Sequence, residues 1–139
     1  MVPMAGAHVP KPDSPEFGTT FDLAEIAAEM LGEAEYTVGP GHAARTILRA
    51  HDLRVVLIAI RAGAHVAEHV AQGTAAIQVV SGRVRIRLPR LARQHEDRFE
   101  ELSPGRLLAM EAGLAHSVEA LEDSAVLLTL GWRERPELP

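Results

Sequence analysis

The sequence predicts an all-β domain, an antiparallel sandwich or barrel preceded by one helix. Three observations support this. Short runs rich in β-branched residues recur from residue 43 onward, turn-forming residues separate them, and no helical segments alternate with them. Of the 139 residues, 47% are hydrophobic, which is enough for one packed core. We therefore expect one domain over residues 20–139, with the barrel itself at about residues 43–132.

The N-terminal part is expected to contain a flexible arm and then a helix. Residues 1–19 hold four of the nine prolines and little periodic hydrophobicity, which is typical of a mobile arm. A helix follows at about residues 21–32, where Thr19 or Thr20 would be the N-cap and Gly32 would mark the end. Its apolar stripe would pack on the outside of the barrel and consists of Leu23, Ile26, Ala27, Met30 and Leu31.

Strand-like runs account for most of the remaining chain. Ser81-Gly82 lies between two of them and predicts a tight hairpin turn. The predicted strands are residues 45–48, 53–60, 74–80, 83–88, 99–102, 106–110, 116–121 and 125–132.

One of these runs carries a ladder of arginines on the face opposite its apolar residues. The ladder would bind an anion or, alternatively, pair with acidic side chains on a neighbouring strand. It consists of Arg83, Arg85 and Arg87 and continues into Arg90 and Arg93.

Composition excludes several classes of function. The net charge of -5 argues against nucleic acid as a partner. No apolar run approaches the roughly 18 residues of a membrane span, and the proline-broken N-terminus does not resemble a signal peptide, so we expect a cytoplasmic protein. The chain has no cysteine, which excludes disulfides and thiolate chemistry.

Two stretches with matched internal spacing are the main indication of function. The first, from Gly63 to Gly82, reads Gly-x5-His-x-Ala-x3-Ala-x6-Gly. The second, from Gly105 to Ala120, reads Gly-x5-Glu-x-Gly-x2-His-x3-Ala. Together they resemble the two motifs of the cupin superfamily, Gly-x5-His-x-His-x3-4-Glu-x6-Gly and Gly-x5-Pro-x-Gly-x2-His-x3-Asn. The resemblance implies a double-stranded β-helix, or jelly-roll, barrel and a homodimer.

The resemblance also implies a metal site, which this chain keeps only in part. In the family, the positions of His69, Ala71, Ala75 and His116 hold a divalent metal through three histidines and one glutamate. Only two imidazoles remain here. We therefore expect no resident cofactor, and the alternative is a divalent transition metal at His69 and His116. His65 is a candidate third ligand, because it has the same strand parity as His69.

The alanines at ligand positions predict a small-molecule pocket inside the barrel. Residues two apart in a strand share a face, provided that no bulge intervenes. The pocket would be mostly apolar with two polar groups, as small-molecule sites usually are. Alternatively, Met110, Leu114 or Leu128 would fill the space. The predicted pocket residues are His69, Ala71, Ala75, Ile77, His116, Val118 and Ala120.

Three functional hypotheses follow. The first is a cupin-like protein that binds a small organic ligand in the barrel without metal catalysis. The second is a metal-dependent dioxygenase or isomerase with a reduced His69/His116 site. The third is a non-catalytic structural or regulatory dimer with a filled barrel.

Overall fold

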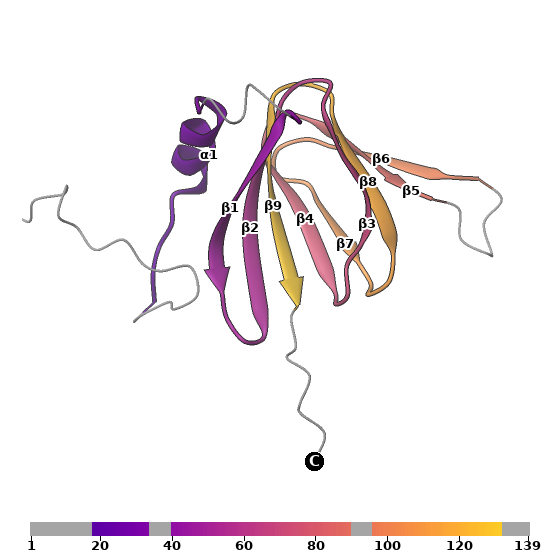
Figure 1. Cartoon of the computed structure of the whole chain (residues 1–139), viewed down its shortest axis with the longest axis horizontal. Helices are drawn as coiled ribbons and strands as arrows, with labels where there is room; N and C mark the ends of the chain where they lie inside the picture. Colours follow the sequence, from indigo (N-terminus) through magenta and orange to yellow (C-terminus); the bar gives the residue numbers. More distant parts are fainter. Residues whose placement is uncertain (1–17, 34–39, 90–95, 132–139) are drawn as a thin grey trace, which may run out of the picture.

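Two antiparallel sheets stacked face to face form the body of the protein (Figure 1). The structure is a computed structural model, and it describes residues 18–33, 40–89 and 96–131. These residues form nine strands and one helix, which confirms the predicted all-β class. Most of the predicted N-terminal arm lies outside the described residues, and so does Trp132 at the end of the last predicted strand.

The chain alternates between the two sheets. All eight predicted runs correspond to strands, and the strand β3 was missing from the prediction. The larger sheet has the order β1-β2-β9-β4-β7 and consists of β1 (His42–Arg49), β2 (Leu53–Ile60), β9 (Ser124–Gly131), β4 (Ala75–Ser81) and β7 (Leu107–Met110). The smaller sheet has the order β3-β8-β5-β6 and consists of β3 (His65–Val70), β8 (Ala115–Ala120), β5 (Val84–Leu88) and β6 (Arg98–Leu102).

The turn at Ser81-Gly82 is not the predicted hairpin. The strand before it, β4, lies in the larger sheet, and the strand after it, β5, lies in the smaller one. Gly82 has φ +83°, and a Cβ there would lie 2.3 Å from Ser124 Oγ. Ser124 Oγ accepts the backbone N–H of Arg83 at 3.0 Å, so this corner is held by β9 rather than by pairing of its own strands.

Helix α1 (Leu23–Leu31) lies on the outer face of the larger sheet (Figure 1). The predicted N-cap, Thr19 or Thr20, was wrong by two or three residues. Asp22 is the N-cap, and its side chain accepts the backbone N–H of Glu25 at 3.0 Å. Gly32 follows the last helical residue, as predicted. No helix in the described ranges is long and apolar enough to cross a membrane.

Two hydrophobic clusters form the core, one on each face of the larger sheet. The outer cluster joins α1 to the sheet through Ala27, Met30, Ile47, Leu57, Ala59 and Ala125. The inner cluster fills the space between the sheets. Its members come from seven of the nine strands and the loop after β3, and include Ile60, Ala71, Ala75, Ile77, Val79, Val84, Ile86, Leu102, Met110, Val118, Ala120 and Val126.

Candidate functional site

The two histidines singled out by the spacing lie side by side. His69 on β3 is the cross-strand partner of His116 on β8. Their ring centroids are 4.1 Å apart, and the ring planes meet at 64°. His116 is 1% exposed, whereas His69 is an exposed residue. One imidazole is therefore inside the barrel, and the other borders solvent beside it.

A β-bulge in β3 brings His69 to the inner face. Val66 of β3 is opposite Val118 of β8, and His69 is opposite His116. Between these two pairs β3 advances by three residues, whereas β8 advances by only two. The extra residue in β3 reverses the alternation, so Val66 and His69 share a face although they are three apart.

The bulge overturns the expectation for His65. This residue is opposite Glu119, on the outer face of the sheet, and is exposed. The prediction that it shares a face with His69 was wrong, because strand parity does not survive an inserted residue. Glu68 also faces outward, where its carboxylate lies 3.7 Å from Arg87.

Both imidazoles are held by backbone carbonyl groups. His69 Nδ1 lies 3.0 Å from the oxygen of Ala67, and His116 Nδ1 lies 3.2 Å from the oxygen of Leu114. A carbonyl oxygen only accepts, so each Nδ1 carries the hydrogen, and each neutral ring keeps its lone pair on Nε2. His116 Nε2 is buried and has no hydrogen-bond partner among the described residues.

Burial keeps the inner imidazole uncharged. Loss of solvation lowers the pKa of His116 below its ordinary value, the hydrogen bond to Leu114 opposes this, and the neighbouring His69 lowers the pKa further. At neutral pH, Nε2 of His116 is therefore a hydrogen-bond acceptor that faces apolar surroundings. Burying an acceptor without a donor costs about 1–3 kcal/mol of folding free energy, so a ligand or water molecule that donates to this atom would stabilise the fold.

The cavity beside the two rings is small. Its volume is about 20 Å³, which is close to the roughly 10–15 Å³ needed for one water molecule. The lining is apolar apart from the two histidines and consists of Ile58, Ile60, Val66, His69, Ile77, His116, Val118, Val126 and Leu128.

Four of the seven predicted pocket residues line this cavity, and the three alanines do not. Ala71, Ala75 and Ala120 are buried in the surrounding inner cluster. Of the proposed space fillers, Met110 is 2% exposed within that cluster, and Leu128, like Leu114, packs against it. The alternative of a repacked interior is therefore the better description. Apart from Val66 of β3, the remaining lining residues lie in the nearly continuous apolar runs of β2 and β9, which do not distinguish a site from a core.

The described residues do not fit the metal ion implied by the resemblance. Across residues 18–33, 40–89 and 96–131, no three histidine, aspartate or glutamate side chains are grouped so that they could hold a metal. Structural and catalytic metal sites use three or four protein ligands, whereas this cavity offers the Nε2 atoms of His69 and His116.

The arginine ladder is paired with acidic side chains. Arg85 lies 3.6 Å from Glu101 and 4.0 Å from Glu119. Arg87 donates to Asp97 at 2.8 Å. The pairing alternative thus describes these two arginines, while Arg90 and Arg93 lie outside the described residues.

Comparison with known proteins identifies the fold. No family model matches the chain, and no curated protein matches it. Among solved structures, a cupin superfamily protein from Desulfitobacterium hafniense is similar with a TM-score of 0.65 at 16% identity, over 88% of this chain and 96% of that one. A conserved protein of unknown function from Streptococcus pyogenes has a TM-score of 0.63 at 18% identity, over 93% and 100%.

An enzyme also has this fold. The oxalate decarboxylase of Lactobacillus farciminis is similar with a TM-score of 0.61 at 24% identity, over 72% of this chain but only 31% of the enzyme. Likeness at these identities establishes architecture and not activity. The jelly-roll topology, the two spaced motifs and these neighbours agree, and the chain therefore has the cupin fold.

Proposed function

We propose that the protein binds a small organic molecule through the paired imidazoles of His69 and His116, without a resident metal. The observation that carries the proposal is the buried, unpartnered Nε2 of His116 beside the cavity. It is a fixed hydrogen-bond acceptor in an apolar wall, and such an atom selects a ligand that brings a donor.

The size of the cavity limits which part of the ligand enters. A volume of about 20 Å³ admits one hydroxyl or amino group and no ring. The donor group would replace a water molecule at Nε2 of His116. The rest of the ligand would lie over the exposed His69. The ligand class is therefore a small alcohol or phenol.

The test uses phenol and fluorobenzene, which are similar in size but differ in the hydroxyl donor. In ¹⁵N-histidine-labelled protein, phenol should shift the Nε2 resonance of His116, and fluorobenzene should not. His116→Leu should abolish phenol binding, while His65→Leu, a matched change on the outer face, should leave it intact. Equal responses to both compounds, or none to either, would reject the proposal.

A filled barrel favours a second candidate, a non-catalytic structural or regulatory homodimer. The specific observation is the same small cavity, which leaves no room for an enclosed ligand. Light scattering on the purified protein tests the dimer. A dimer that binds neither probe, and that keeps its mass and stability in His116→Leu, would favour this candidate over the first.

A further inference from the structure

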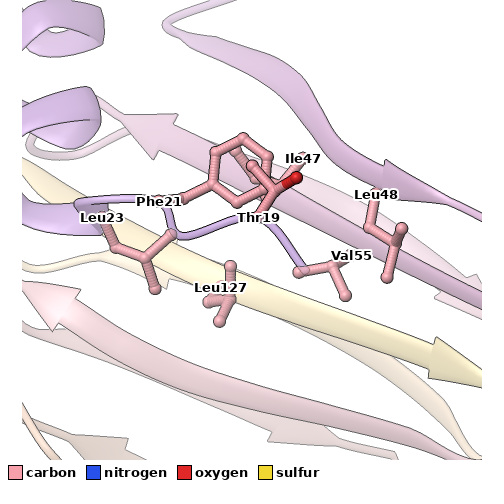
Figure 2. Close-up of a pocket in the computed structure, with 7 residues that line it drawn as sticks. All are labelled: Thr19, Phe21, Leu23, Ile47, Leu48, Val55 and Leu127. Carbon is pink, nitrogen blue, oxygen red and sulfur yellow. The ribbon is translucent and has the colours of Figure 1, made fainter. Parts of the chain in front are cut away.

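A much larger cavity lies outside the barrel, between the segment that leads into α1 and the outer face of the larger sheet (Figure 2). Its volume is about 310 Å³, and part of its boundary is open to solvent. Six apolar side chains form its walls: Phe21, Leu23, Ile47, Leu48, Val55 and Leu127.

The backbone builds this cavity with a bulge in β1. Thr46 is opposite Val56 and Leu48 is opposite Val55, so Ile47 is an extra residue in its strand. The consequence is that two consecutive side chains, Ile47 and Leu48, both line the cavity (Figure 2). Bulges re-aim side chains in this way beside binding sites.

The opposite wall is anchored both to α1 and to the sheet. Asp22 caps α1 through its bond to the backbone N–H of Glu25 and thereby fixes the direction of the segment that carries Phe21 and Leu23. Phe21 also packs against the outer cluster, as does Leu127 from β9. The two walls are therefore held apart by structure that does not depend on an occupant.

The lining selects a neutral, mainly hydrocarbon occupant. The Thr19 hydroxyl is its one polar side-chain group within the described ranges, and no charged side chain lines it there. A peptide segment would bring backbone N–H and C=O groups that need partners, whereas a hydrocarbon chain brings none. An apolar cavity of about 150 Å³ holds benzene, so this one has room for a chain of roughly eight to ten carbons.

We propose that this outer cavity binds the hydrocarbon chain of a small neutral amphiphile, with the polar end at the solvent-open side. Burial of the hydrocarbon chain provides the affinity, and the open boundary lets the polar end of the amphiphile remain hydrated. This site is separate from the histidine pair, because none of its lining residues also lines the barrel cavity.

The test is a titration of the full-length, methyl-labelled protein with 1-octanol, followed by ¹H–¹³C NMR. Methyl resonances of Leu48, Val55 and Leu127 should shift, while those of Ile77 and Val118 in the barrel should not. The matched ligand 1,8-octanediol has the same chain but would have to bury a hydroxyl, and it should bind at least about tenfold more weakly.

Two variants check the location. Leu48→Lys should weaken 1-octanol binding by about tenfold or more, because it places a charge in the cavity. Leu107→Lys, at an apolar residue of β7 that is 54% exposed, should not change binding. Should Leu48→Lys fail to fold, Val55→Phe, which narrows the cavity without adding charge, is the second variant and should also weaken binding.

Several outcomes would overturn the proposal. Shifts confined to the barrel methyl groups would place the ligand at the histidine pair. The absence of shifts up to the solubility limit of 1-octanol would mean that the cavity binds no such chain. Shifts of the same outer methyl groups on raising the protein concentration alone, lost in Leu48→Lys, would identify a second copy of the chain as the occupant.

Discussion

The two faces of the larger sheet differ in the titratable side chains and in the volume of the cavity that border them. The inner face borders a cavity of about 20 Å³ and, across it, the two imidazoles of the smaller sheet. The outer face has no titratable side chain lining its cavity in the described ranges, yet that cavity measures about 310 Å³. The position at which cupins would place a metal is nearly closed, and the larger of these two cavities lies on the other side of the same sheet.

The difference follows from what each face packs against. The inner face meets a second sheet whose apolar residues interlock with it, and interiors of this kind leave few voids. Within the described part of the chain, the outer face meets one nine-residue helix, which cannot cover five strands. Helix α1 covers only part of that face (Figure 1). The cavity is lined by Leu23, the first residue of the helix, and by Thr19 and Phe21 of the segment before it.

The largest effect is expected from rebuilding the metal ligands that the family spacing implies. Ala71→His with Ala75→Glu should lower the free energy of unfolding by about 4 kcal/mol or more, because both sites are buried and an overpacked, charged core is costly. Since the space is filled, added Zn²⁺ should not restore the melting temperature, which is the measurement. If Zn²⁺ raised the melting temperature of the double mutant by more than that of the wild type, the barrel would still have room for a metal site.

Shortening one isoleucine on each face compares the two cavities directly. Ile77→Ala in the barrel should cost about 3–4 kcal/mol, and Ile47→Ala outside should cost about 2 kcal/mol, because Ile47 already borders open space. Denaturant unfolding of both variants gives the two values. Ile77→Ala should also tighten phenol binding by enlarging the cavity beside His116. Equal costs would mean that the outer cavity is closed in solution.

The sequence was sufficient for the fold because its signals are local. Alternating apolar residues and the matched glycine spacings predict strands and their order along the chain. The same local rules failed where contacts between residues distant in sequence determine the structure. Gly82 was expected to form a hairpin, but it turns a corner between sheets because Ser124, far along the chain, binds the backbone beside it.

The candidate site was predicted in part for the same reason. The resemblance of the motifs placed His69 and His116 at one site, and the structure pairs them across β3 and β8. The motifs could not show the bulge in β3, because a bulge is defined by the pairing with another strand, here β8, which is distant in sequence. The small size of the barrel cavity, and the outer cavity formed by residues 19–23 with three strands, depend on side chains distant in sequence and have no local signal.

A smaller effect is expected from acid. The pKa of His116 is lowered in the folded state by burial, so the unfolded chain binds a proton more readily. The free energy of unfolding should therefore be constant above the ordinary pKa of 6.5 and should fall as the pH drops below it, by at most about 1.4 kcal/mol per pH unit for one proton.

Urea unfolding at several pH values measures this dependence. His116→Gln should remove this contribution, while His65→Gln, a change at an exposed histidine of the outer face, should retain it. The same slope in His116→Gln as in the wild type would assign the acid sensitivity to other groups.

The smallest effect is expected from filling the outer cavity. Val55→Phe adds a ring where space already exists, so it should stabilise the fold by about 0.5–1 kcal/mol. The same change at Val79, which is 2% exposed in the inner cluster, should destabilise it by about 1–3 kcal/mol, since no space is present there. Denaturant midpoints of the two variants give the sign of each change. Destabilisation by both would mean that the outer face is packed as tightly as the barrel, and the contrast between the two faces would then be lost.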